Sequence, residues 1–260
     1  MTKLYIIKIG GNVIDDEVVL GSFLKSFAAV NGHKILVHGG GKIATSIAEK
    51  LNIDQQLIDG RRITDAATLK VITMVYAGLI NKSIVASLQA NSCNALGLTG
   101  ADGNLIQSHK RVHPSVDYGF VGDVDVVNGR FLEMLLREHL VPVVAPLTHD
   151  HQGQLLNTNA DTIAQEISKT MSKMFDITLI YCFEKNGVLK SIDNENSVIR
   201  QMDHKDYQTL RSTGAIYAGM IPKLDNAFTA LDNGIKKVII GNSAFLHQLI
   251  SEDAGTVIFK

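Results

Sequence analysis

The strongest chemical signal in the chain is a lysine beside a pair of glycines, followed by a second glycine loop. The apolar run 4–9 contains Lys8 and leads directly into Gly10 and Gly11. A lysine within an apolar run, followed by residues without side-chain bulk, is typical of a loop whose backbone N–H groups approach an anion while the ammonium reaches the same place. A second apolar run, 35–38, ends in three glycines, 39–41. Two such loops predict one cleft that handles phosphate.

The glycine loops could also be plain turns or nucleotide-binding loops of another kind. Either loop alone is equally well explained as a tight turn. Gly39, Gly41 and Ala44 match the loose dinucleotide-binding pattern G-x-G-x-x-A. This pattern needs an acidic residue about 20 positions on, at the end of the next apolar strand, but the nearest candidate, Asp59, lies in a polar turn, which weakens the match. Lys42 is not followed by Ser or Thr, as a Walker loop requires. The His-Arg-Asp catalytic loop of protein kinases is also absent.

Composition is that of an ordinary globular protein and argues against several functions. The 260 residues are 45% hydrophobic, enough to bury a sizeable core. Lys and Arg total 25 against 26 Asp and Glu, so there is no basic field for nucleic acid. We find no leader-like segment and no apolar run approaching the ~20 residues that span a bilayer. We therefore expect a cytoplasmic protein without a nucleic-acid or membrane partner.

The cysteines and the paired histidines carry little functional signal. Cys93 and Cys182 are far apart and have apolar neighbours, so we expect buried free thiols. His149 and His151 resemble metal ligands, but the polar residues after them indicate an exposed turn between strands, and a metal site needs further ligands in fixed geometry. We therefore name no protein ligand for a metal.

Ile- and Val-rich runs alternate with segments of helical period along the whole chain. This pattern is typical of parallel strands covered by helices on both faces, and it predicts an α/β fold, a three-layer αβα sandwich around a mainly parallel open sheet. We expect one continuous sheet with two lobes that meet near 171–176. The predicted strands are 4–9, 34–38, 94–98, a pair within 119–127, 141–145, 177–182, 237–240 and 256–259. The predicted helices are 15–31, 44–51, 66–90, 131–138, 160–173, 204–211 and 223–233. A hairpin-like piece is expected around 58–64, and Thr64 or Asp65 would cap the long helix 66–90.

Four more polar clusters follow in order, at 60–65, 155–161, 184–189 and 218–223. Together with the two glycine loops they resemble the amino-acid kinase family, and within it the kinases of N-acylated glutamate, over almost the whole chain. The resemblance implies a single domain, 1–260, with a carbamate kinase-like fold. It also implies an N-lobe, 1–173, for acylglutamate binding and dimerisation, and a C-lobe, 174–260, for ATP.

The implied reaction is phosphoryl transfer from ATP to the side-chain carboxylate of an N-acyl-L-glutamate, giving an acyl phosphate in arginine biosynthesis. A carboxylate is already ionised at neutral pH, so catalysis reduces to bringing two anions together in line and dispersing charge. Mg²⁺ would be held mostly by ATP phosphates and water. The open alternatives are a sibling carbamate, aspartate or glutamate kinase, and a non-catalytic nucleotide-binding regulator. The joint presence of Lys8, Asp161 and Lys223 argues against the regulator.

The resemblance also assigns catalytic roles at matching positions. Lys8 and Lys223 would neutralise the transferring phosphoryl group from two sides, with amides around Gly11 and Gly40 donating to its oxygens and Asp161 holding both ammonium groups. Taken alone, Asp161 is also explained as a helix-start carboxylate, and Lys223 as a solvated lysine at a helix start, where the helix dipole disfavours it.

Binding roles follow in the same way. The acceptor residues would be Gly40, Gly41, Arg62 and Asn157, since a planar guanidinium suits a bidentate carboxylate contact, although Arg62 alone is also explained by surface solvation. Arg61 stands where relatives commonly have an apolar residue. One hypothesis is that Arg61 binds the extra carboxylate of N-succinyl-L-glutamate, and the rival explanation is that it points to water. The ATP-binding residues would be Gly10, Glu184, Lys185, Asn186, Gly187, Val188, Leu189, Ala215, Ile216 and Tyr217. The stretch 182–186 departs from the usual aspartate followed by a small turn.

The assembly is also an expectation from the resemblance. Feedback-inhibited relatives carry a helix before the first strand that links dimers into hexamers, whereas here that strand begins close to Met1. We therefore expect a homodimer, built around the helix 66–90 and insensitive to arginine.

Overall fold

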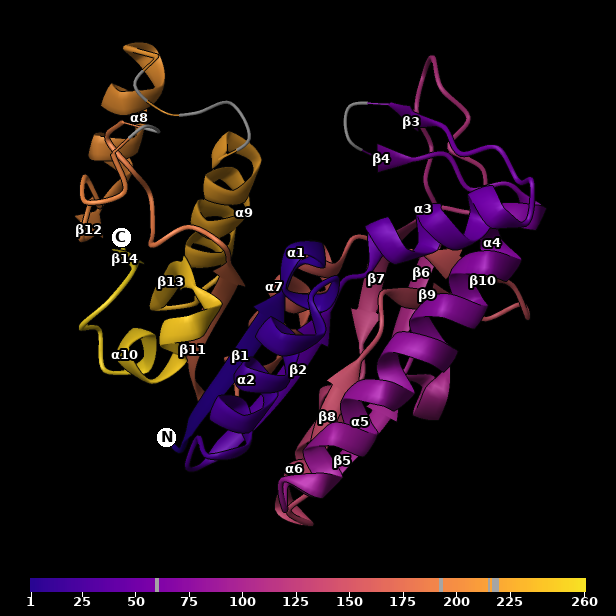
Figure 1. Ribbon diagram of the computed structural model, residues 1–260, viewed down its shortest axis with the longest axis horizontal. Helices are drawn as coiled ribbons and strands as arrows, with labels where there is room; N and C mark the ends of the chain where they lie inside the picture. Colours follow the sequence, from indigo (N-terminus) through magenta and orange to yellow (C-terminus); the bar gives the residue numbers. More distant parts are fainter. Residues whose placement is uncertain (59–60, 192–193, 215, 217–219) are drawn as a thin grey trace.

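An eight-stranded sheet forms the centre of the computed structural model, which describes residues 1–58, 61–191, 194–214, 216 and 220–260 (Figure 1). The strand order is β12-β14-β13-β11-β1-β2-β8-β5. These strands are β1 (Lys3–Ile9), β2 (His33–His38), β5 (Ala95–Leu98), β8 (Val141–Val144), β11 (Asp176–Phe183), β12 (Gln201–Met202), β13 (Lys237–Asn242) and β14 (Thr256–Ile258). The α-helices are α1 (Gly11–Ile14), α2 (Glu17–Ala28), α3 (Gly41–Lys50), α4 (Ala66–Ile72), α5 (Asn81–Ala90), α6 (Gly129–Arg137), α7 (Ala160–Met171), α8 (His204–Ser212), α9 (Ile221–Asp232) and α10 (Leu246–Ile250).

The central strands are parallel, and both of their faces are buried. In β1, Leu4 and Ile6 belong to the core on one face of the sheet, and Ile7 and Ile9 to the core on the other. Such strands are near-continuous apolar runs rather than alternating ones. β1 pairs in parallel with both β2 and β11, and the β13–β14 pair is antiparallel. The predicted mainly parallel α/β sheet is therefore confirmed, and it is continuous across the residues where the lobes were expected to meet.

Helices cover both faces, which confirms the predicted three layers. α6, α7, α8 and α9 contribute to the core on one face, and α2, α3, α5 and α10 to the core on the other. α2 illustrates how the ends of a helix are fixed. The side chain of Asp16 accepts hydrogen bonds from the first turn, and the buried Lys34 ammonium donates to the carbonyls of Ala28, the last residue of the helix, and of Val30 just beyond it, both at 2.7 Å.

The segment Ala66–Ala90 is one long helix in which the stretch Thr73–Ile80 is π-helical. Asp65, not Thr64, caps it, because the Asp65 carboxylate accepts from the Thr68 N–H at 2.7 Å. By length and composition alone this helix could cross a membrane, a possibility that the search for apolar runs missed. The test is weak, because a core helix also passes it, and here Ile72, Ile80 and other side chains of the helix are buried in the core.

A smaller sheet stands beside the large one and differs in part from the prediction. Its strands, in order, are β10 (Leu155–Asn157), β9 (Leu147–His149), β6 (Ile106–Lys110) and β7 (Gly122–Val127), and the predicted hairpin is β3 (Leu57–Ile58) with β4 (Arg61–Arg62). The predicted strand pair within 119–127 is wrong: only β7 forms there, because Gly119 adopts φ +69° and bridges to Thr64 instead. The His149–His151 turn lies between β9 and β10, as expected.

The carboxyl ends of β1, β2 and β11 lie at one edge of the sheet. In Figure 1, α8 and α9 rise on one side of this edge, the β3–β4 hairpin and α3 rise on the other, and α1 lies between them. Ligands of open α/β sheets bind beyond the carboxyl ends of the strands. The glycine loops after β1 and β2 therefore meet where a ligand site is expected.

Candidate active site

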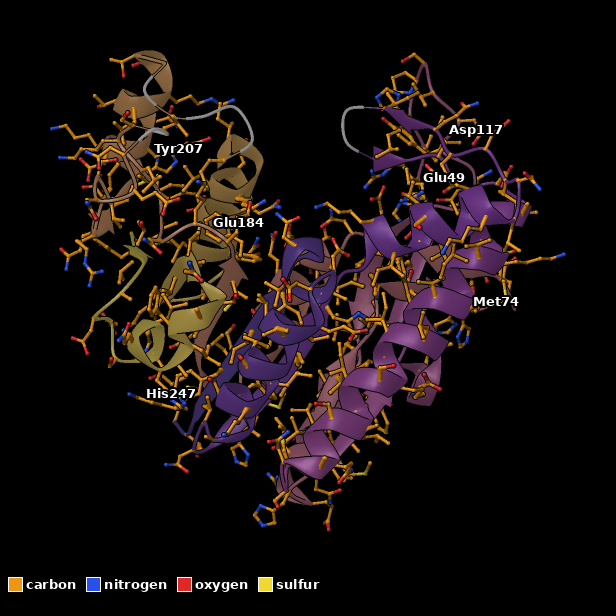
Figure 2. The ribbon with its side chains drawn as sticks, viewed as in Figure 1. Glu49, Met74, Asp117, Glu184, Tyr207 and His247 are labelled. Carbon is orange, nitrogen blue, oxygen red and sulfur yellow. The ribbon has the colours of Figure 1, made fainter. Side chains whose placement is uncertain are left out.

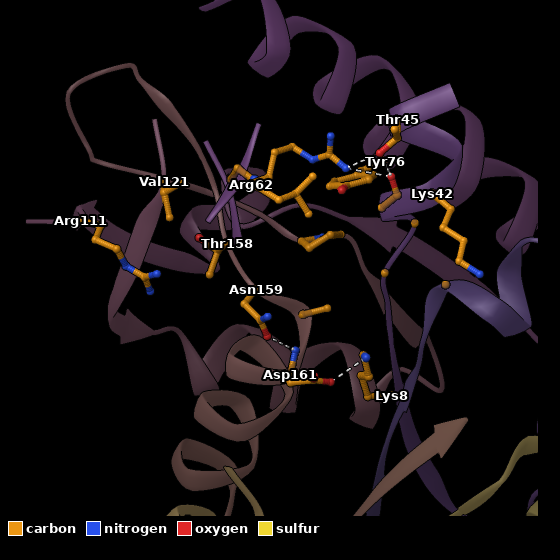
Figure 3. A pocket seen from close by; sticks show the side chains of 18 residues that line it. Lys8, Lys42, Thr45, Arg62, Tyr76, Arg111, Val121, Thr158, Asn159 and Asp161 are labelled. Carbon is orange, nitrogen blue, oxygen red and sulfur yellow. Dashed lines mark hydrogen bonds and ion pairs between the residues drawn. The ribbon is translucent and has the colours of Figure 1, made fainter. Parts of the chain in front are cut away.

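Two adjoining cavities open at this edge. The first, of about 400 Å³, is lined by residues between Lys8 and Asp161 (Figure 3). The second, of about 330 Å³, is lined by the loop after β1, the end of β11 and Lys223. The residues common to both linings are Lys8, Gly11, Gly41, Lys42 and Asp161. A group held in one cavity therefore lies beside a group held in the other, with cations at the junction.

An ion pair between Lys8 and Asp161 lies at the junction, with 2.7 Å between the ammonium and the carboxylate. The exposed fractions of the two side chains are only 13% and 18%. Asn159 caps α7 by accepting from the N–H groups of Asp161 and Thr162, so the Asp161 carboxylate is not needed as the cap and points to Lys8 (Figure 3). The sequence prediction that these two residues meet is confirmed.

Lys223 lies in the first turn of α9 and lines the second cavity together with Asp161. Its ammonium lies 5.9 Å from the centre of the Phe183 ring, which gives it a cation–π contact. Among the described contacts, Lys8 rather than Lys223 pairs with Asp161. The predicted second contact of Asp161 therefore remains a prediction.

Gly40 has a backbone that only glycine adopts without strain, with φ 142° and ψ 19°. A Cβ at this position would lie 2.2 Å from the Ile80 Cδ1 atom and 3.3 Å from the Tyr76 ring. The loop therefore lies directly on the π-helical stretch and exposes backbone, not side chains, to the first cavity.

We expect Gly40→Ala to lower the free energy of unfolding by about 2–3 kcal/mol, because it adds a strained φ to a steric clash. Chemical denaturation measures this change. Gly153→Ala is the matched control, since Gly153 also has positive φ but a Cβ added there would meet no atom within 4 Å. Equal losses in the two variants would mean that the contacts with Ile80 and Tyr76 add nothing.

Arg62 enters the first cavity from β4, with part of its guanidinium already held by protein. One nitrogen donates to the Gly41 carbonyl at 2.9 Å and to the Thr45 hydroxyl at 2.8 Å, and the other donates to the Gln55 side chain. Figure 3 shows the guanidinium beside Thr45 and Tyr76. Three of its five N–H groups are used in these contacts, so the guanidinium charge is held in place among the residues that line the cavity.

Asn157 lines the same cavity from the end of β10, and its side-chain N–H₂ donates to the Thr64 hydroxyl at 3.0 Å. The Asn157 backbone N–H donates to Phe120, so the strand end is fixed on both sides. Arg62, Asn157 and the glycine loop, which are distant in sequence, therefore line one cavity, as the sequence predicted.

The predicted ATP residues separate into two groups. Gly10 and Glu184 line the second cavity. Residues 185–189 line neither cavity. Lys185 pairs with Glu195 at 2.9 Å, and the Asn186 side chain accepts from Asn242. The buried Val188 N–H donates to Thr256, while Gly187 and Leu189 complete this turn. Ile216 is buried in the core. Ala215, Tyr217 and the side chain of Arg61 lie outside the described part of the chain.

Several residues of the site were not identified from the sequence. They include Lys42, Thr45, Tyr76, Arg111 and Val121, all of which line the first cavity. Lys42 follows the glycine loop directly, and its position there was a usable signal. Tyr76 had no such signal, because within an apolar helix it looks like any core residue; burial raises the pKa of its hydroxyl.

Among the residues that the structure describes, the carboxylates that line the two cavities are Asp161 and Glu184. Asp161 is already paired with Lys8. Within the described ranges, no three His, Cys, Asp or Glu side chains are arranged to hold a metal ion. Both cysteines are free and buried, as predicted, and burial raises the pKa of Cys182 to about 12.

His38, the last residue of β2, is completely buried immediately before the glycine loop. Its Nδ1 lies 2.8 Å from the Gly39 carbonyl oxygen, and its Nε2 lies 3.1 Å from the Asn81 side-chain nitrogen. Burial is the main cause that lowers the pKa of His38 from 6.5 to about 4; the Gly39 contact opposes this shift and nearby Lys82 adds to it.

We expect the free energy of unfolding to fall by about 3 kcal/mol between pH 7 and pH 4 through His38 alone, since each pKa unit corresponds to about 1.4 kcal/mol. The sign follows because the unfolded chain binds a proton below pH 6.5, whereas the folded chain does so only near pH 4. Denaturation of the parent and of His38→Asn over this pH range isolates the effect. Parallel pH profiles would contradict a buried neutral His38.

Comparison with known proteins shows the family of this chain. Residues 3–242 match the model of the amino acid kinase family, and the chain belongs to that family. It is 54% identical to an acetylglutamate kinase of Bacteroides fragilis over 258 residues, covering 99% of this chain and 97% of that protein. It is 55% identical to an acetylglutamate kinase of Cytophaga hutchinsonii over 254 residues, covering 97% and 96%.

A solved structure extends the likeness of the fold. Carbamate kinase from Giardia lamblia, bound to AMP-PNP, superposes with a TM-score of 0.70 at 13% identity, covering 100% of this chain and 99% of that one. At this identity the likeness concerns the fold alone, and it confirms the predicted carbamate kinase-like architecture.

Proposed function

We propose that this chain transfers the γ-phosphoryl group of ATP to the side-chain carboxylate of N-acetyl-L-glutamate, forming an acyl phosphate in arginine biosynthesis. The observation that carries the proposal is the Lys8–Asp161 pair at the junction of two cavities. The high identity to acetylglutamate kinases, over nearly the full length of both chains, supports the choice of acceptor within the family.

The chemistry needs cations and amides more than acids and bases. The acceptor carboxylate is ionised at neutral pH, so no residue has to remove a proton from it. Lys8 at the junction and Lys223 in the second cavity would balance the charge that spreads over the transferring group, and the Gly11 and Gly40 amides would donate to its oxygens. Asp161 fixes the Lys8 ammonium in position, which reduces reorganisation during transfer.

The first cavity would hold the acceptor. Arg62 would balance the charge of the backbone carboxylate, and Asn157, Gly40 and Gly41 complete the polar lining. The described residues that line this cavity all fall within 8–161, whereas those of the second also include residues from 181–223. That division supports the proposed N-lobe, 1–173, for acylglutamate and C-lobe, 174–260, for ATP.

Magnesium would enter with ATP. Of the two described carboxylates in the cavity linings, Asp161 is occupied by Lys8, and Glu184 lies beside the second cavity. This donor set fits an ion whose ligands are mostly phosphate oxygens and water, and such an ion neutralises phosphate charge.

We also propose that the chain is a cytoplasmic homodimer built around the helix Ala66–Ala90. Met74 and Leu79 on this helix are 56% and 52% exposed, and Figure 2 places Met74 on its outer side. Large exposed apolar side chains on one element favour an interface. Light scattering would measure a mass near twice 28.3 kDa, and a hexamer or a monomer would contradict the proposal.

The proposed activity is tested by trapping the acyl phosphate with hydroxylamine in the presence of ATP, with and without Mg²⁺. The acceptors to compare are N-acetyl-L-glutamate, N-succinyl-L-glutamate, L-glutamate, L-aspartate and carbamate. We expect product from the acetylated acceptor. Product only from a free amino acid or carbamate would indicate a sibling kinase, and ATP binding without any product would indicate a nucleotide-binding regulator.

The succinylated acceptor is included because Arg61 precedes Arg62. If Arg61 reads an extra carboxylate, Arg61→Leu lowers kcat/KM for N-succinyl-L-glutamate and spares N-acetyl-L-glutamate. Equal turnover of both acceptors by the variant and the parent would remove this hypothesis.

A further inference from the structure

A buried polar chain connects the glycine loop after β2 to the long helix. His38 contacts the Gly39 carbonyl through Nδ1 and the Asn81 side chain through Nε2. The side-chain nitrogen of Asn81 also donates to the Val143 carbonyl at 3.0 Å, and the side-chain oxygen of Asn81 accepts from the Lys82 ammonium at 3.1 Å. His38 and Asn81 are both essentially inaccessible to solvent. None of these contacts is explained by the proposed roles of the cavity residues.

The partners of His38 select one arrangement of its proton. The Gly39 carbonyl can only accept, so Nδ1 must carry hydrogen. The side-chain nitrogen of Asn81 can only donate, so Nε2 must be the acceptor. Only the neutral Nδ1–H form satisfies both partners, and the pKa of about 4 agrees with it. His38 is therefore a fixed hydrogen-bond donor to the Gly39 carbonyl.

The orientation of that carbonyl determines the orientation of the next amide. In a trans peptide the C=O of one residue and the N–H of the next point in opposite directions. The bond from His38 holds the Gly39 oxygen toward the buried imidazole. The Gly40 N–H is thereby turned away from the imidazole, on a loop whose three glycines line the first cavity.

We infer that His38, held by Asn81, is a positioning residue that aims the Gly40 amide at the transferring phosphoryl group. This inference rests on the proposed function, in which that amide stabilises the phosphoryl oxygens. Asn81 directly follows the π-helical stretch whose Tyr76 and Ile80 lie against Gly40. One segment of the long helix therefore supports the loop both by packing and by a hydrogen bond, in keeping with the frequent occurrence of π-helical turns at functional sites.

Two substitutions of His38 distinguish positioning from packing. His38→Asn keeps a donor close to the position of Nδ1 but leaves a cavity, whereas His38→Phe fills the space and cannot donate. If positioning matters, kcat falls about 10- to 100-fold in His38→Phe, while KM for both substrates stays within about twofold of the parent. His38→Asn then retains most of the parental kcat. If His38 only packs, His38→Phe retains kcat and His38→Asn loses it.

Both variants are assayed at a temperature at which thermal unfolding shows them to be folded. Retention of kcat by folded His38→Phe, or equal losses in the two variants, would overturn the inference. The ¹⁵N shifts of the His38 ring provide an independent readout in the parent: we expect the Nδ1–H form, and an Nε2–H form would also overturn it. A parent without kinase activity would count against the proposed function, while the ring shifts would still test the geometry.

Discussion

Replacing Lys8 by methionine reduces kcat for phosphoryl transfer by about 10³-fold, corresponding to about 4 kcal/mol of transition-state stabilisation. Methionine keeps the apolar stem of the side chain and removes the charge. The effect is large because Lys8 is mostly buried at the junction of the two cavities, where water does not screen its interaction with the phosphoryl group. Steady-state kinetics with saturating ATP and acceptor measure it.

The comparison needs a charge-matched control and a partner variant. Lys236→Met removes an exposed lysine that pairs with Asp176 on the surface, and it should leave kcat within about twofold of the parent. Asp161→Asn keeps the shape of the partner but frees the Lys8 ammonium, so we expect an intermediate loss of about 10²-fold. A Lys8→Met variant that keeps more than a tenth of the parental kcat would show that Lys8 is not in the catalytic machinery.

Replacing Arg62 by lysine raises KM for the acylglutamate about 10- to 100-fold and leaves KM for ATP nearly unchanged. One charged hydrogen bond is worth about 1.5–3 kcal/mol. A lysine ammonium cannot reproduce the planar contacts with the Gly41 carbonyl, the Thr45 hydroxyl and the Gln55 side chain, so its charge would not be held in the same place beside the acceptor. Initial rates with each substrate varied in turn separate the two constants.

The control for Arg62 is Arg137→Lys, an exposed arginine that pairs with Glu133 within α6. It should change neither constant. The assignment of the first cavity to the acceptor would be contradicted by an Arg62→Lys variant in which KM for ATP rises as much as KM for the acylglutamate.

The large sheet was predictable because its strands have a strong and simple signal. Strands buried on both faces need apolar side chains at nearly every position, so β1, β2 and β11 are distinct in the sequence. The lysine in β1 was correspondingly conspicuous. Its partner Asp161 was assigned through the family resemblance of the polar cluster 155–161, because by itself it could equally be a helix-start carboxylate; the structure shows that Asn159 is the cap.

The smaller sheet was harder to predict because it is not buried in this way. β6 contains Gln107, Ser108, His109 and Lys110, and its pairing with β7 across many intervening residues leaves no local pattern. The cavity residues Tyr76 and Arg111 were missed for a related reason. They reach the site through tertiary contacts that no short motif encodes: Tyr76 through the π-helical stretch, and Arg111 through its pairing with Asp123 on β7.

The central claim, that the acceptor is the side-chain carboxylate of N-acetyl-L-glutamate, is tested most directly by an isotope measurement. The acceptor is labelled with ¹⁸O in the side-chain carboxylate, or in the backbone carboxylate as control, and the acyl phosphate is observed by ³¹P NMR in the reaction mixture. We predict an isotope shift of the acyl phosphate resonance with the side-chain label and none with the backbone label. An unshifted resonance with the side-chain label would contradict the proposed reaction.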